Sequence, residues 1–223
     1  MQWEDEGYLL SKSNFDENSI IVDIFTLNHG KCTGIVYGGS SRKNKKIFQI
    51  GNKIFINYKS KNVNKIGYFK VELIKPISPP FFDDKKRSIC ILAASSILKI
   101  LLPEHQINKK IYGSFEDFFN TLNSKDWIKL YILWEISIIK ELGFGFDLTN
   151  VINSSNNSSH NIVINESTFK IPKLFLQNKD QNFNNKEIAE ALIFSKNLLI
   201  ENFVNPNRIR LPLSRNILEK YFN

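Results

Sequence analysis

The chain has 223 residues, of which 42% are hydrophobic and 13% aromatic, which is enough for one or two packed domains and excludes a wholly disordered chain. Its net charge of +8 favours a polyanionic partner, either nucleic acid or an anionic membrane surface. The longest apolar stretch, Ser88 to Leu102, is interrupted by Lys99 and is too short to span a bilayer. The acidic start, MQWEDEG, is unlike a basic secretory leader, and Cys32 and Cys90 lack CxxC spacing. We therefore expect a cytoplasmic protein, with no membrane association and with reduced, buried thiols.

Alternating polarity and glycine-rich corners characterise the first third of the chain. Segments of this kind occur at residues 7–13, 19–26, 32–38, 53–61 and 67–74. Between the second and the third, Asn28-His29-Gly30 is typical of a turn. Five short strands in about 75 residues predict a small closed barrel of the OB-fold type, although an SH3-like barrel would give a similar pattern.

A proline-rich stretch, Lys75 to Asp84, separates this region from one of helical periodicity. Helices are predicted at 85–102, 115–122, 127–142, 186–203 and 215–222, the first capped by Asp83 or Asp84 and the third by Asp126. The polar stretch 150–161 predicts an exposed loop. The predicted class is α+β: an N-terminal five-stranded OB-fold β-barrel (1–76), a linker (77–84) and an all-α helical bundle domain (85–223) with an Asn/Ser-rich insertion at about 150–182.

No catalytic or metal-binding pattern is present in the sequence. His29, His105 and His160 are scattered without ligand spacing, and no GxSxG segment occurs. The glycines Gly38 and Gly39 are not followed by the Gly-Lys-Ser/Thr of a phosphate-binding loop. We therefore expect a protein that is not an enzyme and that holds no metal and no cofactor.

Charge is distributed very unevenly along the chain. Between Ile24 and Val71 there is no Asp or Glu, where random placement would put about five of the 22 acidic residues, and there are ten basic residues with aromatic residues among them. A cationic barrel surface with exposed rings is typical of sequence-tolerant single-strand binding. The candidate nucleic-acid-binding residues are Lys31, Arg42, Lys43, Lys45, Lys46, Lys59, Lys61, Tyr37 and Tyr58. The alternative is a solvated surface whose aromatic residues all belong to the core.

Several motifs resemble the RecO family of bacterial recombination mediators, in particular its alphaproteobacterial members. They are Asp5-Glu6-Gly7, Thr26-x-x-His29-Gly30, Gly38-Gly39-x-Ser41-Arg42, FQIGN (48–52), GYFKVEL (67–73), LLPE (101–104), WEISIIKELGFGFDL (134–148) and RLPLSR (210–215). In many relatives cysteines follow the Gly-Phe-Gly segment and some form a zinc site. Here Val151 stands near the first such position, so the resemblance implies a zinc-free variant.

The resemblance also implies a function and partners. The function is binding single- and double-stranded DNA, annealing complementary strands without ATP and helping to load recombinase. The partners are RecR and the acidic, apolar C-terminal tail of single-strand-binding protein. A runner-up function is that of an RNA-binding OB-fold module in translation or ribosome assembly.

An acidic tail with an apolar tip requires a hydrophobic pocket edged by cations. The candidate residues for binding this tail are Trp134, Ile138, Arg208, Arg210, Leu211 and Arg215. The alternative is that Trp134 and Leu211 belong to the core and that the arginines cap helix ends.

Overall fold

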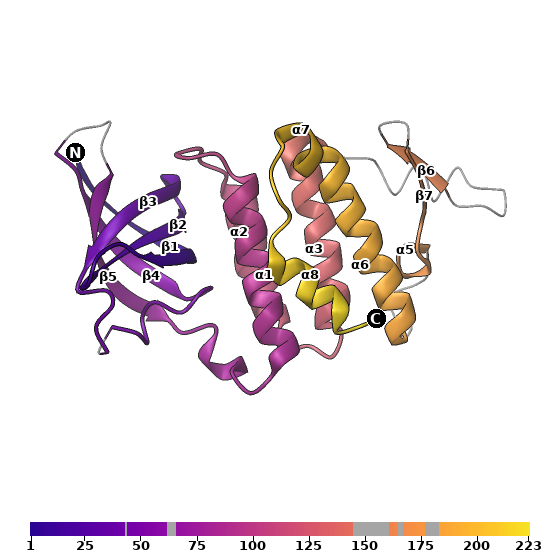
Figure 1. Cartoon of the computed structure of the whole chain (residues 1–223), viewed down its shortest axis with the longest axis horizontal. Coiled ribbons are helices and arrows are strands. Elements are labelled where there is room, and N and C mark those ends of the chain that lie inside the picture. The colour runs from indigo at the N-terminus through magenta and orange to yellow at the C-terminus, as the bar shows by residue number, and fades with distance from the viewer. Residues whose placement is uncertain (43, 62–65, 145–160, 165–166, 177–182) are drawn as a thin grey trace. The chain divides into compact units, whose positions relative to one another are not determined.

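The computed structural model describes residues 1–42, 44–61, 66–144, 161–164, 167–176 and 183–223 (Figure 1). By its contacts the chain divides into two compact units, residues 1–116 with 212–215, and residues 117–211 with 216–223. The first unit holds the barrel and the second holds most of the helices. Each unit is described below by itself.

Five strands form the barrel of the first unit. They are β1 (Gln2–Asn14), β2 (Ser19–Thr26), β3 (Gly30–Tyr37), β4 (Lys53–Lys59) and β5 (Gly67–Lys75). The barrel closes in the order β1-β2-β3-β5-β4, with β4 pairing back onto β1. All neighbouring strands are antiparallel except β3 and β5, which pair in parallel through Gly34 with Gly67 and Ile35 with Tyr68. This strand order is that of the OB fold, and it decides between the two barrel types that the sequence left open.

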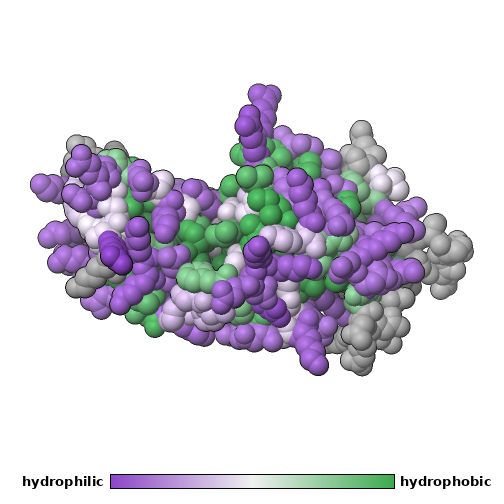
Figure 2. Space-filling model, turned by 60° about the horizontal axis from the view of Figure 1, so that its bottom comes forward, coloured by the Kyte–Doolittle hydropathy of each residue, from purple (hydrophilic) through white to green (hydrophobic). Residues whose placement is uncertain are grey.

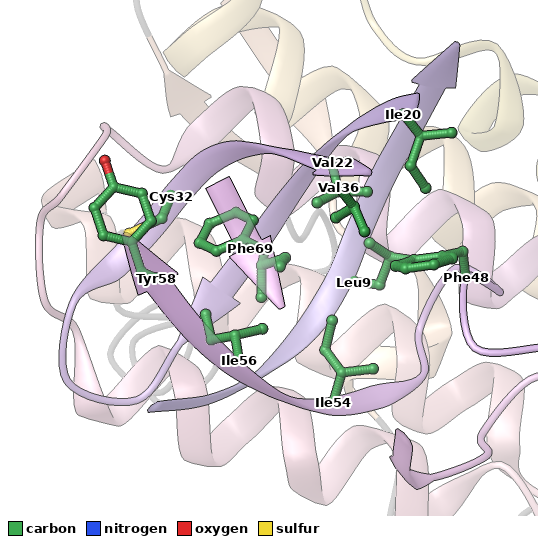
Figure 3. Packing of buried hydrophobic residues seen from close by; sticks show 11 residues of the cluster. Leu9, Ile20, Val22, Cys32, Val36, Phe48, Ile54, Ile56, Tyr58 and Phe69 are labelled. Atoms are coloured by element: carbon green, nitrogen blue, oxygen red, sulfur yellow. The ribbon is translucent and has the colours of Figure 1, made fainter. Parts of the chain in front are cut away.

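The inward residues of the strands alternate with outward ones and fill the barrel with branched aliphatic side chains and two aromatic rings (Figure 3). Leu9, Val22 and Ile56 are fully buried at its centre. Two glycines leave room for the rings. A Cβ at Gly34 would lie 2.4 Å from the ring of Phe69, and a Cβ at Gly67 would lie 2.2 Å from the ring of Tyr58.

Helix α1 (Lys85–Leu101) follows a short 3-10 turn, η1 (Pro79–Phe81), in the predicted linker. Of the two candidate caps, Asp84 is the one that functions: its carboxylate accepts a hydrogen bond from the backbone N–H of Arg87 at 3.0 Å. Helix α2 (Lys109–Thr121) begins six residues before the predicted position. The side chain of Asn108 caps it by accepting from the N–H of Ile111 at 2.9 Å. The sequence did not predict this start, because two lysines and a glycine follow Asn108 and interrupt the apolar periodicity of the helix.

Helix α2 is joined to the barrel through Glu116, which belongs to a charged cluster in the first unit. The Lys53 ammonium lies 2.8 Å from the Glu6 carboxylate and 2.9 Å from that of Glu116, and the Tyr8 hydroxyl donates to Glu116 at 2.8 Å. The hydrogen bond from Lys53 lowers the pKa of Glu116. Burial, reinforced by Glu116, raises the pKa of Tyr8.

The helical unit contains α3 (Trp127–Ile139), the π-helical turn η2 (Lys140–Phe144), α5 (Lys173–Leu176), α6 (Asn185–Leu199), η3 (Ile200–Val204) and α7 (Asn205–Asn207). Helix α8 (Leu213–Lys220) closes the chain. Asn184 and Glu187 form a capping box at the start of α6, whereas Asp126 precedes α3 without a side-chain capping bond.

The predicted helical domain is confirmed, and the structure adds to it a two-stranded hairpin, β6 (Asn161–Ile164) with β7 (Ser167–Lys170), which the all-α description did not include. The hairpin lies within the predicted insertion at 150–182, where two four-residue strands in a polar tract give too short a pattern to detect. The predicted domain boundaries at 76 and 85 stay a prediction.

Candidate nucleic-acid interface

Two tyrosines stack on one another at the end of the barrel where the β1–β2 and β4–β5 connections meet. Tyr37 pairs with Ser19 at the start of β2, and Tyr68 pairs with Lys59 at the end of β4. The ring centroids of Tyr37 and Tyr68 are 4.9 Å apart at an interplanar angle of 18°. Tyr37 is 64% exposed and Tyr68 39%, so ring surface remains open to solvent. In OB folds these two connections border the surface that binds oligonucleotides.

A pocket of about 570 Å³ opens beside the tyrosines. It arises because β3 and β5 pair through only two residues of each strand and then diverge. Buried side chains of the core, Val36, Phe48 and Phe69, form its apolar floor, and all three appear in Figure 3. Its polar lining residues are Gln2, Asn44, Asn57, Lys59 and Lys70.

Cationic side chains are exposed on the two segments that follow β3 and β4. Arg42, Lys45 and Lys46 are exposed on the connection from β3 to β4, and Lys59 and Lys61 are exposed at the end of β4. Figure 2 shows hydrophilic side chains over the barrel, at the left of the view. The hydrogen bond between Tyr37 and Tyr68 raises the pKa of Tyr37, and burial and the charge of Asp16 add to this effect.

The basic connection is held in place by two asparagines and a glycine. Gly38 has a φ of +69°, which favours glycine, and its carbonyl accepts from the Asn44 amide at 2.9 Å. The fully buried Asn52 amide donates to the carbonyls of Lys46 and Ile47 at 3.2 and 3.1 Å. Its oxygen accepts from the N–H of Ile77 at 2.9 Å. The lysines are therefore presented on an anchored turn.

Of the predicted binding residues, Tyr37 and Lys59 line the same pocket. Arg42, Lys45 and Lys46 are exposed on the β3–β4 connection, which lines that pocket through Asn44, and Lys61 is exposed just after β4, while Lys43 lies outside the described residues. Lys31 does not belong to this group, since it lies at the opposite end of β3. There it donates to the Lys99 carbonyl at 2.8 Å and its ammonium lies 3.4 Å from the Glu104 carboxylate. Its charge is thereby neutralised locally.

Tyr58 is a correction to the prediction. Its side chain belongs to the barrel core (Figure 3) and is only 8% exposed. Its ring stacks on that of Trp3 with centroids 4.7 Å apart. A ring so packed cannot take a base. Tyr68 and Lys70, which the prediction did not include, line the same pocket, and strand alternation could have indicated their exposure because both lie on the outward side of β5.

The predicted tail-binding residues are only partly at the surface. Trp134, Ile138 and Arg215 are buried, which corrects their assignment as pocket-lining residues. Apolar side chains on α3 pack into the helical unit, where the Trp134 ring lies 5.0 Å from that of Phe118. Arg208 and Arg210 are exposed and Leu211 is half-buried.

Asp5, His29 and Cys32 are residues of types that can take part in catalysis, but in the barrel they contact one another or are buried. The buried Asp5 carboxylate accepts from the backbone N–H of Asn28 at 2.8 Å and lies 2.8 Å from Nδ1 of His29. Burial raises the pKa of the Cys32 thiol to about 12, so the thiol is not a nucleophile at neutral pH. Over the described ranges, no three His, Cys, Asp or Glu residues are arranged to hold a metal ion. His160 and Val151 lie outside those ranges.

Among the helices of the described ranges, none has the length and apolar character that a membrane span requires.

The fold and this surface define the class of the protein: an OB-fold barrel bearing a cationic surface with exposed aromatic rings, followed by a helical region. The family model described as recombination protein O N terminal matches residues 1–77, and the one described as recombination protein O C terminal matches residues 83–199. The chain therefore belongs to the RecO family.

Curated relatives in alphaproteobacteria are similar to the chain. The DNA repair protein RecO of Wolbachia pipientis subsp. Culex pipiens is 34% identical over 151 residues, which are 67% of this chain and 62% of the relative. That of Ehrlichia chaffeensis is 32% identical over 175 residues, 78% of this chain and 68% of the relative. That of Cereibacter sphaeroides (strain ATCC 17025) is 30% identical over 149 residues, 67% and 62% of the two chains. The match with the Wolbachia and Cereibacter relatives thus spans less than two thirds of their length.

Proposed function

We propose that this chain is a non-enzymatic mediator of DNA repair and recombination, which binds single-stranded DNA on the barrel and anneals complementary strands without ATP. The observation that carries the proposal is the exposed Tyr37–Tyr68 pair on an OB-fold barrel whose β3–β4 connection exposes Arg42, Lys45 and Lys46. Family membership supports the same process, since the curated relatives are named DNA repair proteins.

The physical basis is neutralisation of phosphate charge. Two complementary strands repel one another, and side chains that neutralise phosphates release bound counterions and lower that repulsion. Aromatic faces add sequence-tolerant stacking, which holds bases unpaired until a partner strand arrives. Annealing by this route needs no nucleotide hydrolysis. The same cationic residues serve double-stranded DNA through its phosphates.

The partners belong to the proposal as well. We place RecR and the acidic tail of single-strand-binding protein among them, so that the protein helps to load recombinase on coated strands in the cytoplasm. For the tail, the exposed Arg208 and Arg210 are the candidate contacts that remain at the surface. Replacing both by Glu should lower affinity for a tail peptide severalfold and leave annealing of bare strands unchanged.

The test of DNA binding is a triple replacement of Arg42, Lys45 and Lys46 by Ala. For a single-stranded oligonucleotide, each lost phosphate contact lowers the slope of log affinity against log salt by about 0.7, so the slope should fall by about 2. The matched control replaces Lys85, Lys109 and Lys125, which are also exposed, by Ala, with the same change in net charge. The control should keep the wild-type slope. Equal slopes for all three proteins would refute the assignment, and tighter binding of RNA than of DNA would favour a role in translation instead.

A further inference from the structure

We infer that the pocket between β3 and β5 accommodates one unstacked nucleobase of the bound strand, with its ring against the Tyr37–Tyr68 pair. This inference rests on the proposed function and adds a defined subsite to it. The pocket volume of about 570 Å³ lies within the range of about 300–1,000 Å³ usual for sites that enclose small molecules.

The lining has the chemistry that a nucleotide requires. A base is a flat ring with apolar faces and a polar edge, and it is attached to an anionic backbone. Buried Val36, Phe48 and Phe69 supply an apolar floor, and the tyrosines supply a ring face. Lys59 and Lys70 lie among the lining residues, within the same pocket, where they supply the positive charge that the attached phosphates need.

Amide side chains supply groups for the polar edge of the base. The Asn57 NH2 group donates to the Glu4 carboxylate at 2.6 Å, and the Asn44 NH2 group donates to the Gly38 carbonyl at 2.9 Å. Each bond engages one of the two N–H groups of the amide, which leaves the amide oxygen as an acceptor and the second N–H as a donor for the edge of a base. The lysines and Gln2 add donors for its carbonyl groups. Because donors and acceptors are both present, the pocket does not select a single base.

The depth of the pocket makes it specific for nucleic acid that is not base-paired. The floor residues belong to the barrel core, so a ring that reaches them must leave its own stack and base pair. Phosphate contacts alone would serve single and double strands alike. The inferred pocket therefore assigns the preference for single-stranded nucleic acid to particular residues.

The experiment compares an oligo(dT) strand with a strand of the same length in which the bases are replaced by abasic sites, both measured by fluorescence anisotropy. The two strands carry the same phosphates, so the cationic surface binds them equally. Stacking of one base should make the wild-type protein bind oligo(dT) roughly 5- to 150-fold more tightly. Tyr68→Ala and Tyr37→Ala should reduce this ratio, while Tyr37→Phe, which keeps the ring, should retain it.

The outcomes separate the pocket from the proposed function. Equal wild-type affinity for both strands, or a Tyr68→Ala variant with an unchanged ratio, would overturn the base pocket while leaving phosphate binding intact. Failure to bind either strand would instead refute the proposed function, and the pocket with it. A third variant, Asn57→Leu, should lower affinity for oligo(dT) and leave affinity for the abasic strand unchanged.

Discussion

Replacing Asn52 by Ala tests whether hydrogen bonds from this side chain anchor the lysine-bearing connection between β3 and β4. The Asn52 side chain joins two segments, since it donates to the carbonyls of Lys46 and Ile47 and accepts from the N–H groups of Ile77 and Ser78. Alanine removes all four hydrogen bonds and opens a small cavity at a fully buried position. The two N–H groups are buried and lose their acceptor.

The magnitude follows from how well each group can recover a partner. The bonds to the Lys46 and Ile47 carbonyls are only partly buried, so these carbonyls can bind water at little cost. The N–H of Ile77, bonded at 2.9 Å, is buried, and leaving such a donor unsatisfied costs about 1–3 kcal/mol. The longer bond from Ser78, at 3.4 Å, adds less. With the cavity included, the free energy of unfolding should fall by about 3 kcal/mol.

Urea denaturation followed by circular dichroism measures this change. The matched control is Gln49→Ala, because the Gln49 amide also donates to a carbonyl of the same connection, that of Lys45 at 2.7 Å, but does so at the surface. The control should change the unfolding free energy by less than about 0.5 kcal/mol. If Asn52→Ala cost no more than Gln49→Ala, the anchoring role of Asn52 would be refuted.

Two further substitutions test the packing and the charges of the first unit. Gly67→Ala places a Cβ 2.2 Å from the Tyr58 ring and should destabilise the protein by about 1–3 kcal/mol in the same assay, whereas Gly113→Ala, with nothing within 4 Å, should not destabilise it. Burial raises the pKa of Asp23, but hydrogen bonds led by that from Lys99 outweigh it and hold the pKa below its usual value. The resulting stability is present above pH of about 4 and is lost as the pH falls through the lower folded pKa, so Asp23→Asn should flatten the acid limb of the stability profile. An identical acid limb in that variant would contradict this linkage.

The barrel could be predicted because its signal is local. More and less buried residues alternate along β4 and β5, and turns such as Asn28-His29-Gly30 separate strands. The strand order could not be read in the same way. Whether β5 joins β3 depends on the pairing of Gly34 with Gly67, residues far apart in the chain, and no local pattern reports such a contact.

The sequence indicated which connection carries exposed cations, but not which aromatic rings are exposed. The acid-free stretch includes Arg42, Lys45 and Lys46, which the structure leaves exposed, and their role in binding nucleic acid stays a prediction. Adjacent residues of one strand face opposite sides, so Tyr58 and Lys59 cannot both be outward, and alternation alone would have placed Tyr58 inside. The neutralisation of Lys31 depends on Glu104, which only the tertiary fold brings to it. The burial of Trp134 likewise depends on tertiary contacts, such as that with Phe118, which no local sequence pattern reports.

Annealing of complementary oligonucleotides, labelled with a donor and an acceptor fluorophore, tests the central proposal most directly. The reaction is run without ATP on bare strands, with the wild-type protein, the Arg42, Lys45 and Lys46 triple variant, and the Lys85, Lys109 and Lys125 control. The wild-type protein and the control should accelerate duplex formation, and the triple variant should have lost most of this activity. A wild-type protein that leaves the spontaneous rate unchanged, or a triple variant as active as the wild type, would contradict the account.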